Sequence, residues 1–289
     1  MKDIRSVGVN TKVCAVIGNP IKHSLSPVIH NAAFEVLDLD FVYVACKVSN
    51  VKNAVAGVRA LGNFRGLSIT IPHKIEVMKY VDDVDPVDRS IGAINTIICE
   101  KDKLLGLGTD GPGALKAFLD SKVSLDGKNV LILGAGGVGR AIAFTLAHKA
   151  DLAELALLDI NIELLESLKT DLKNNTKIPI KSAEFTSDSL TKAMQYANII
   201  IHCTSVGMYP YKDDSLIPSN LFKPGQVVFD VVYTPLETRL IADAKACGLQ
   251  VISGVEMFIN QAVLQFEKFT GKDAPIEVMR KVVMEHLHH

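Results

Sequence analysis

The sequence has no excess of charge of either sign. Its 289 residues include 31 Lys and Arg against 32 Asp and Glu, which gives a formal net charge of −1, and like charges never form a long block. Proteins that bind nucleic acid or anionic membranes through a basic surface need such an excess. We therefore expect neither nucleic acid nor a membrane as a partner, and any bound anion must be held by local geometry.

Cysteines are also few. There are five, an odd number, and no C-x-x-C pair occurs among them. A disulfide framework and a structural zinc site are therefore not expected, and the pair His202-Cys203 has no further ligand at metal-binding spacing. We expect buried, reduced thiols in a reducing cytoplasm, and no bound metal. The cysteines are Cys14, Cys46, Cys99, Cys203 and Cys247.

No hydrophobic run is suited to a membrane span. The longest apolar stretch, from Val130 to Ala147, contains four glycines and Arg140. This pattern predicts a strand, a turn and a helix. Apolar residues make up 48% of the chain and charged residues 22%, which is typical of a globular protein with a sizeable core.

Apolar runs of strand length alternate with amphipathic helical patterns through most of the chain. Strands are predicted at Val13–Gly18, Phe41–Val48, Leu67–Ile71, Val130–Leu133, Leu155–Asp159, Ile199–Cys203, Val227–Val231 and Gln250–Ser253. Helices are predicted at Pro27–Leu37, Val51–Leu61, Val138–His148, Ile162–Leu172, Leu236–Ala246 and Val255–Phe269. Parallel strands need helical crossovers of this kind, so the predicted fold class is α/β.

Residues 94–108 break the alternation. The polar segment EKDK separates two apolar runs, which predicts an antiparallel hairpin at the edge of the first sheet. The length of the chain favours two domains, and we place the boundary near Gly111. Residues 1–111 are expected to form an α/β domain with a mixed sheet, completed by the helices of residues 255–289. Residues 112–254 are expected to form a doubly wound parallel sheet of the Rossmann type.

A glycine motif opens the second domain. Gly134, Gly136 and Gly139 follow an apolar strand and precede an amphipathic helix. In this context the three glycines allow a tight turn, the approach of a pyrophosphate to the backbone, and close helix–strand packing. The N–H groups at the helix start favour phosphate binding. The motif predicts a dinucleotide site that includes Ala135, Gly137 and Val138, and the alternative is a glycine-rich turn without a ligand.

The next strand ends at Asp159. An acidic side chain at this position accepts hydrogen bonds from the adenosine ribose and repels the 2′-phosphate that distinguishes NADP from NAD. No Arg occurs between Asp159 and Thr170 to neutralise such a phosphate. The sequence therefore favours NAD, with NADP possible. The alternative is that Asp159 only caps the following helix.

A serine-containing loop follows the first strand. Ser24 and Ser26 precede Pro27, which favours a helix with Ser26 as its N-cap. Two hydroxyls beside a helix N-terminus suit a carboxylate ligand. The alternative is a simple cap with an incidental serine.

Polar residues also alternate along the third strand. Ser68 and Thr70 are followed by Pro72, which predicts a helix start and places Lys74 in its first turn. The helix dipole would lower the pKa of Lys74 there and prepare it for proton transfer. Asp110, at the domain boundary, could share a substrate hydroxyl with Lys74. The alternatives are a solvated lysine and an ordinary turn aspartate.

These segments together resemble the shikimate dehydrogenase family over nearly the whole chain. The motifs that carry the resemblance are GNPIKHSLSPVIHN at 18–31, GLSITIPHK at 66–74, GAINTI at 92–97, GTDG at 108–111, GAGGVGRA at 134–141, DVVYTPLET at 230–238, GVEMFINQA at 254–262 and TGKDAP at 270–275. The resemblance implies a substrate-binding first domain and an NAD(P)-binding second domain. It also implies the reversible, NAD(P)-dependent reduction of 3-dehydroshikimate to shikimate, a step of chorismate and aromatic amino acid biosynthesis.

The resemblance also implies roles for individual residues. Lys74 and Asp110 become the catalytic acid/base pair, while Ser24 and Ser26 hold the substrate carboxylate. The other implied substrate contacts are Ser68, Thr70, Asn95, Tyr233 and Gln261. The implied cofactor contacts beyond the glycine turn and Asp159 are Thr204, Val231, Gly254 and Met257.

Three positions depart from the family pattern. Ser68 stands where many members have Asn, and Gly108 stands where Asn often precedes the Thr-Asp pair. Asp159 stands where NADP-using members typically have Asn-Arg-Thr, which supports NAD and raises quinate as an alternative substrate. Ser26 is tied by the resemblance to shikimate rather than quinate. A non-catalytic NAD-binding sensor is a further alternative, and the oligomeric state, monomer or homodimer, stays open.

Overall fold

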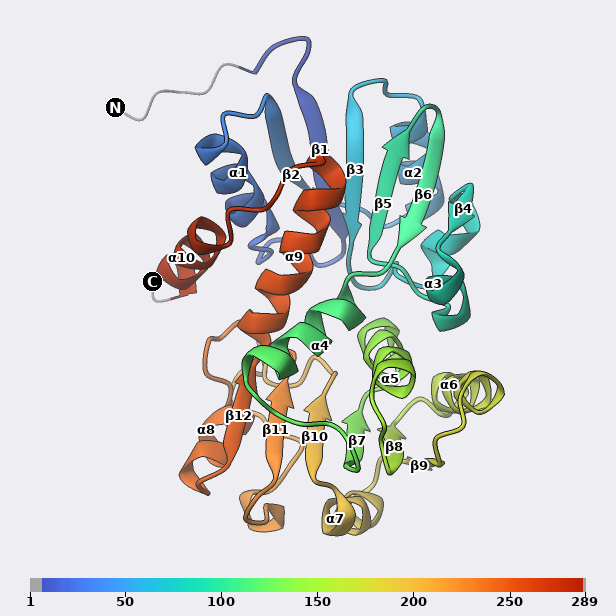
Figure 1. The fold of residues 1–289 in the computed structure, drawn as a ribbon, viewed down its shortest axis with the longest axis vertical. Helices are drawn as coiled ribbons and strands as arrows, with labels where there is room; N and C mark the ends of the chain where they lie inside the picture. The colour runs from blue at the N-terminus through green and yellow to red at the C-terminus, as the bar shows by residue number, and fades with distance from the viewer. Residues whose placement is uncertain (1–6, 288–289) are drawn as a thin grey trace. The chain divides into compact units, whose positions relative to one another are not determined.

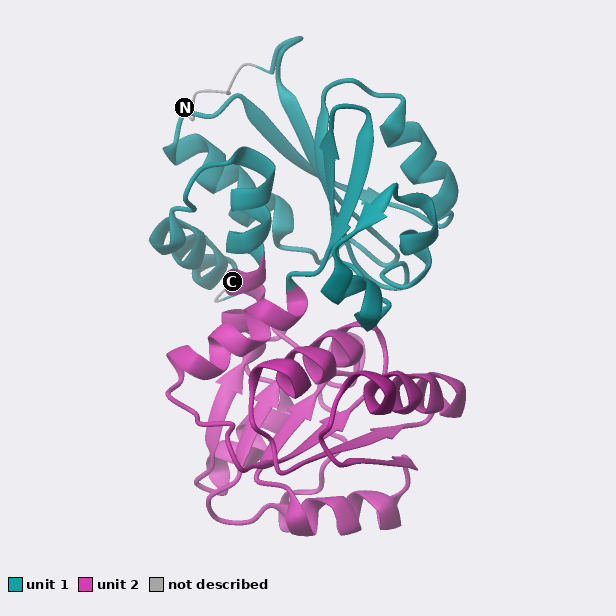
Figure 2. Cartoon of the chain, turned by 45° about the vertical axis from the view of Figure 1, so that its right-hand side comes forward, with its two compact units in different colours: residues 1–109, 262–289 teal, residues 110–261 magenta. Residues whose placement is uncertain are grey.

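The computed structural model describes residues 7–287 and divides into two compact units (Figures 1 and 2). Unit 1 comprises the chain up to Thr109 together with the chain from Ala262 onwards. Unit 2 is the continuous segment Asp110–Gln261. Helix α9 (Gly254–Thr270) begins in unit 2 and ends in unit 1.

Unit 1 contains a mixed six-stranded sheet with the order β2-β1-β3-β5-β6-β4. Its strands are β1 (Lys12–Gly18), β2 (Phe41–Lys47), β3 (Phe64–Ile69), β4 (Asp83–Val84), β5 (Thr96–Glu100) and β6 (Lys103–Leu107). β1 pairs with β2 and β3 in parallel, while β3–β5 and β5–β6 are antiparallel. The predicted hairpin is therefore confirmed. Lys101 and Asp102 form its turn with φ of 45° and 67°, the left-handed region that a two-residue hairpin turn requires.

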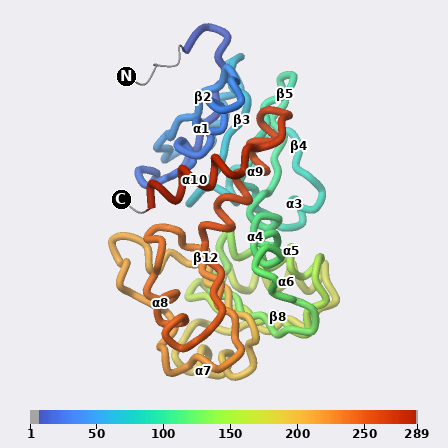
Figure 3. The backbone as a smooth tube through the Cα atoms, turned by 60° about the vertical axis from the view of Figure 1, so that its left-hand side comes forward, coloured from blue at the N-terminus to red at the C-terminus, as the bar shows by residue number. Residues whose placement is uncertain are grey.

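Helices cover both faces of this sheet. They are α1 (Ser26–Val36), α2 (Val51–Arg59), the 3-10 helix η1 (Glu76–Tyr80), α3 (Pro86–Ile91) and α10 (Ile276–Leu287). The alternate residues Ala15, Ile17, Leu67 and Ile69 share a core with Val55 of α2. On the opposite face α10 packs against α1, and the end of α9 lies beside them (Figure 3).

An aromatic cluster forms the core of that second face. His30 of α1 is fully buried and stacks on Tyr43, with ring centroids 4.4 Å apart and an interplanar angle of 6°. Phe266 and Phe269 of α9 lie 6.4 and 5.9 Å from the same imidazole. Gln265 of α9 interacts with the imidazole, and its effect on the pKa of His30 opposes that of burial. Burial lowers the pKa of His30 to about 3.

His30 is expected to make the protein acid-sensitive. The unfolded chain protonates this histidine near its ordinary pKa of about 6.5, whereas the folded state keeps it neutral down to about pH 3. The unfolded state therefore binds more protons below pH 6.5, and stability falls as the pH falls, by about 1.4 kcal/mol for each pH unit. Urea unfolding of wild type and His30→Phe between pH 7 and pH 4 measures this contribution as the difference in slope. His286→Phe, at an exposed position on α10, should keep the wild-type slope, and an unchanged slope in His30→Phe would contradict the assignment.

Unit 2 contains a parallel six-stranded sheet with the order β12-β11-β10-β7-β8-β9. Its strands are β7 (Asn129–Leu133), β8 (Glu154–Asp159), β9 (Ile180–Glu184), β10 (Ile199–His202), β11 (Val227–Asp230) and β12 (Gln250–Ser253). Its helices are α4 (Asp110–Asp120), α5 (Gly137–Lys149), α6 (Ile162–Asn175), α7 (Ser187–Tyr196), the 3-10 helix η2 (Ser219–Leu221) and α8 (Arg239–Ala246). The predicted fold class, a mixed-sheet α/β domain with a Rossmann-type domain, is confirmed.

Apolar strands explain the core of unit 2. Leu131, Leu158, Ile200 and Val228 are fully or almost fully buried beneath α7 and α8. The stretch Val130–Ala147 divides into β7, the glycine turn and α5. No helix in the described residues 7–287 is long and apolar enough to cross a membrane.

The cysteines only partly follow the prediction. All five are free thiols, and Cys14, Cys99 and Cys203 are buried or half-buried. The expectation of burial is wrong for Cys46 and Cys247, which are exposed. Cys46 lies on β2, an edge strand of the sheet, and Cys247 ends the surface helix α8.

Candidate functional site

The glycine turn of unit 2 joins β7 to α5. Gly134 has φ of +107°, which favours glycine, and a Cβ there would lie 2.9 Å from the carbonyl oxygen of Cys203. A Cβ at Gly139 would overlap the carbonyl of Gly134, so helix and strand pack as closely as the motif predicts. Gly136, the N-cap of α5, has no described protein atom within 4 Å of the Cβ position. Contacts within the protein therefore do not require glycine at position 136.

Asp159 lies at the end of β8, beside this turn. Its Oδ2 accepts a hydrogen bond from the N–H of Ala135 at 2.5 Å, and its Oδ1 accepts one from the N–H of Asn161 at 2.7 Å. The capping residue of α6 is Asn161, whose Oδ1 accepts from the N–H of Leu164, so the alternative of Asp159 as the cap is wrong. A carboxylate has about four acceptor sites, so Asp159 can hold ribose hydroxyls in addition to these backbone groups.

The ends of β10, β11 and β12 carry the other predicted cofactor residues. Thr204 follows β10, and its Oγ1 lies 2.6 Å from Nε2 of His202. Nδ1 of His202 lies 2.9 Å from Oδ1 of the fully buried Asp230. The sequence did not predict this Asp230–His202–Thr204 chain, because it connects two strands. It fixes the loop after β10 on which Thr204 stands.

Gly254 and Val231 lie close together in the same unit. A Cβ at Gly254 would lie 2.5 Å from the carbonyl oxygens of both Val231 and Val232, so this glycine is required by the approach of two backbones. One turn further along α9, Met257 is buried. Thr204, Val231 and Gly254 therefore gather where parallel strands end, the usual ligand-binding edge of such sheets.

Tyr233, Gln261 and Asp110 also belong to unit 2. The ring of Tyr233 stacks on Phe258, with centroids 4.4 Å apart, and burial raises the pKa of Tyr233 to about 12. Nε2 of Gln261 donates to the carbonyl of Phe258 at 3.1 Å, and its backbone packs against Gly113 of α4. Asp110 is buried and is the first residue of α4, where the helix dipole favours a carboxylate.

The serine loop of unit 1 differs from the prediction. Helix α1 begins at Ser26, but its N-cap is Leu25 and no side chain caps it. The expectation that the Ser26 hydroxyl caps the helix is therefore wrong. The Ser24 hydroxyl is the nearby acceptor instead, since it bonds the N–H of Ser26 at 3.3 Å. Both serines still lie at a helix N-terminus, where an anion is favoured.

The predicted α-helix at Pro72 is absent. A turn follows β3 and leads into the short 3-10 helix η1, so Lys74 stands before a helical turn and not in the first turn of an α-helix. The carbonyl of Lys74 accepts a hydrogen bond from the N–H of Ile94 at 2.9 Å. This carbonyl is therefore bonded to a distant segment and not to the N–H of a following helical turn. The helix-dipole argument for Lys74 is therefore wrong.

The same backbone bond brings Lys74 next to Asn95. The carbonyl of Asn95 accepts from the N–H of Ile69 at 2.7 Å, and the N–H of Thr70 bonds the carbonyl of Ile17. Ser68, Thr70, Lys74 and Asn95 are thus gathered at one end of the sheet of unit 1. Thr109, a residue that the sequence did not single out, joins them by donating its N–H to Oδ1 of Asn95 at 2.7 Å.

Within residues 7–287 no three His, Cys, Asp or Glu side chains are grouped so as to hold a metal ion. Burial, with smaller contributions from Asp230 and Asp110, raises the pKa of the Cys203 thiol well above its usual range.

Three family models match parts of the chain. Residues 16–97 match the shikimate dehydrogenase substrate binding domain, residues 254–284 the shikimate 5′-dehydrogenase C-terminal domain, and residues 128–221 the lactate/malate dehydrogenase NAD binding domain. A shikimate dehydrogenase (NADP(+)) from Moorella thermoacetica is 39% identical over 282 residues, which cover 96% of this chain and 95% of the relative. The chain belongs to the shikimate dehydrogenase family.

Solved structures of the family have the same fold. A shikimate 5-dehydrogenase from Listeria monocytogenes, in complex with shikimate and NAD, is 31% identical in sequence and has a TM-score of 0.88. The alignment covers 98% of this chain and 100% of the Listeria chain. A shikimate dehydrogenase in complex with NADP+ is 36% identical with the same TM-score, covering 98% of each chain. The resemblance stated from the sequence motifs is therefore confirmed.

These relatives do not support the predicted preference for NAD. The Moorella thermoacetica enzyme is named for NADP(+), and the two solved structures contain NAD in one case and NADP+ in the other. Members of the shikimate dehydrogenase family thus occur with either dinucleotide, and membership alone does not decide between them.

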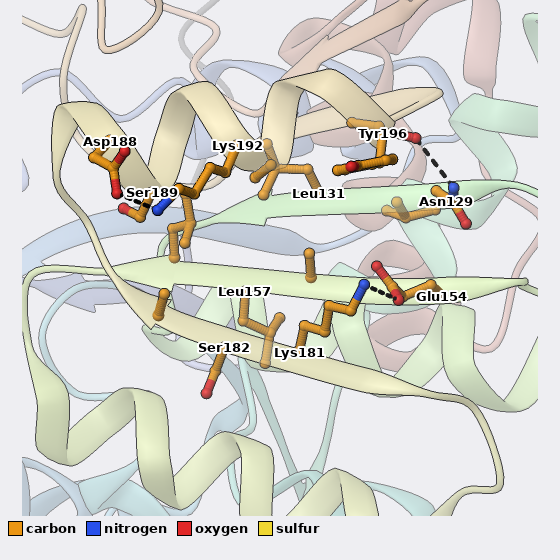
Figure 4. A pocket seen from close by; sticks show the side chains of 16 residues that line it. Asn129, Leu131, Glu154, Leu157, Lys181, Ser182, Asp188, Ser189, Lys192 and Tyr196 are labelled. Atoms are coloured by element: carbon orange, nitrogen blue, oxygen red, sulfur yellow. Dashed lines mark hydrogen bonds and ion pairs between the residues drawn. The ribbon is translucent and has the colours of Figure 1, made fainter.

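A cavity of about 520 Å³ lies elsewhere in unit 2, between α7 and strands β7 to β9 (Figure 4). Its floor is apolar, and its charged rim is paired internally, Lys181 with Glu154 and Lys192 with Asp188, each at 2.6 Å. None of the predicted site residues lines it. We assign it no part in the chemistry of this family.

Proposed function

We propose that this protein is a shikimate dehydrogenase that reversibly reduces 3-dehydroshikimate to shikimate with NAD(P), as a step of chorismate and aromatic amino acid biosynthesis in the cytoplasm. The observation that carries the proposal is the gathering of Thr70, Lys74 and Asn95 at one end of the sheet of unit 1. Hydroxyl, amine and amide groups in this combination suit a polyhydroxylated ring. The names of the relatives support the same substrate.

In this proposal unit 2 holds the dinucleotide, and the substrate contacts are those that the family resemblance implies. Ser24 and Ser26 hold the carboxylate at the N-terminus of α1, while Thr70, Asn95, Tyr233 and Gln261 contact the ring. The glycine turn and α5 hold the pyrophosphate, and Thr204, Val231, Gly254 and Met257 surround the remainder. When bound, the dinucleotide would supply the hydride that C3 of the substrate accepts.

Lys74 provides the proton. As the C3 carbonyl becomes an alkoxide, the ammonium of Lys74 transfers a proton to its oxygen, and Asp110 orients the resulting hydroxyl. In the oxidation direction Lys74, as the neutral amine, takes the same proton back. The reaction therefore balances, because the carbonyl gains one hydride and one proton and becomes an alcohol.

We also propose that NAD is the preferred dinucleotide. The support is Asp159, whose carboxylate is fixed beside the turn by two backbone N–H groups. A 2′-phosphate at the same place would meet this negative charge.

A four-way assay tests the proposed function. Shikimate or quinate is offered with NAD or NADP, and formation of the reduced dinucleotide is followed by absorbance. We expect the highest kcat/KM with shikimate and NAD. Turnover of quinate but not shikimate would instead identify a quinate dehydrogenase, and dinucleotide binding without turnover of either would identify a sensor.

A further inference from the structure

Gln265 of α9 has no role in the mechanism above, yet it is 1% exposed and its carboxamide is fully engaged within unit 1. Its Oε1 accepts from the hydroxyl of Ser68 at 2.7 Å. Its Nε2 donates to Oγ1 of Thr96 at 2.9 Å and to the carbonyl of Asn95 at 3.2 Å. A buried amide with all of these bonds made holds its neighbours in one orientation.

The bond to Thr96 has a consequence for Asn95. Because Oγ1 of Thr96 accepts from Gln265, its proton is directed to Oδ1 of Asn95, 3.0 Å away. The N–H of Thr109 donates to the same Oδ1 at 2.7 Å, and Nδ2 of Asn95 donates to Oγ1 of Thr109 at 2.9 Å. Two donors on Oδ1 fix which end of the Asn95 amide accepts and which donates.

The network continues on the other side of Gln265. The hydroxyl of Tyr43 donates a hydrogen bond to Oγ of Ser68 at 2.6 Å, and the hydroxyl of Ser68 donates in turn to Oε1 of Gln265. Ser68 stands where many family members have Asn, and here its proton is committed inside the protein. Hydrogen bonding toward the substrate from this part of the sheet therefore depends more on Asn95.

We propose that Gln265 is a positioning residue for substrate recognition. Acting through the hydroxyl of Thr96, it fixes in one orientation the amide of Asn95, a proposed contact of the substrate. This inference rests on the proposed function, since it deepens the account of the same site. It predicts that the polarity of the side chain at position 265, and not only its size, controls affinity for shikimate.

Steady-state kinetics of two near-isosteric variants test this. Q265E replaces the NH2 by a carboxyl oxygen with at most one proton, so it cannot donate to both Thr96 and the carbonyl of Asn95 as Gln265 does, and Q265M removes the amide altogether. We expect each to raise KM for shikimate about 10-fold, equivalent to ~1.4 kcal/mol, with KM for the dinucleotide and kcat changed less than threefold. Thermal unfolding reports stability separately.

Gln226 of unit 2 offers a matched control. It is 4% exposed, its Nε2 donates to the carbonyls of Met194 and Ala197, and its Oε1 accepts from the N–H of Lys223. Q226M therefore removes an equally satisfied buried amide that is not part of the site. It should lower the unfolding temperature and leave both KM values unchanged.

T96V supplies an independent route, because it is nearly isosteric and removes only the hydroxyl that links Gln265 to Asn95. We expect T96V to raise KM for shikimate as Q265M does, and the double variant T96V/Q265M to be no more than twofold worse than either single variant. If Q265M does not fold, Q265E and T96V carry the test.

Three results would overturn the inference while leaving the proposed function intact. All three assume that the wild-type protein oxidises shikimate. In the first, Q265E and T96V leave KM for shikimate unchanged. In the second, the increases in KM caused by T96V and Q265M multiply in the double variant, and in the third, Q226M raises KM as much as Q265M does. A wild-type protein that oxidises no shikimate overturns the proposed function, and this inference with it.

Discussion

Replacing Lys74 by alanine should lower kcat for shikimate oxidation at least ~100-fold, the lower end for a lost general acid or base. Without the amine, no group at this end of the sheet of unit 1 is assigned to exchange a proton with the C3 oxygen. Steady-state turnover with saturating shikimate and dinucleotide measures the loss. KM for the dinucleotide should change little, because Lys74 lies in unit 1.

A second lysine serves as the control for this prediction. Lys79 is an exposed residue of η1, five positions further along the chain. Lys79→Ala should retain wild-type turnover. Near-normal kcat in Lys74→Ala would remove Lys74 from the mechanism, and a comparable loss in Lys79→Ala would indicate damage to the segment and not to the chemistry.

Replacing Asp159 by alanine should shift the preference from NAD towards NADP. The change removes the negative charge that opposes a 2′-phosphate and the acceptor for the ribose hydroxyls. Loss of a hydrogen bond to a charged group corresponds to roughly 10- to 100-fold in affinity. We expect the ratio of kcat/KM for NAD to kcat/KM for NADP to fall by at least this factor.

Asn161 provides the matched variant. Asn161→Ala removes the cap of α6 and should cost about 1 kcal/mol of stability, but it leaves the Asp159 carboxylate in place. The dinucleotide ratio should then stay at the wild-type value. If Asp159→Ala leaves the ratio unchanged, the carboxylate serves only to tie the glycine turn to the start of α6.

The central strands were predictable because buried parallel strands are continuous apolar runs. Val130–Leu133 and Ile199–Cys203 are of this kind, and both appear as β7 and β10. The sequence did not predict β9, because IKSAE is the sequence of a half-exposed edge strand. It did not predict α7 either, because that helix buries only Leu190 and Met194 and so has a weak apolar pattern. β4 has two residues, too few for any period to be recognised.

Local patterns failed where distant contacts decide the structure. Pro72 suggests a helix start, but Ile94, twenty positions after Lys74, captures the carbonyl that the helix would need. The bond between Ser68 and Gln265 joins positions 197 residues apart, so no motif could contain it. The family motifs nevertheless predicted both Lys74 and Asn95 as site residues, and the backbone bond from Ile94 to Lys74 brings their segments together.

Unit 1 is built from two segments separated by the whole of unit 2. As the chain leaves the ribosome, the strands that flank α1 emerge early, whereas Phe266 and Phe269, which cover His30, emerge late. The intervening unit is continuous and can fold in the meantime. The residues of α1 and β2 that surround His30 are therefore translated early but complete their native packing only after α9 has been made.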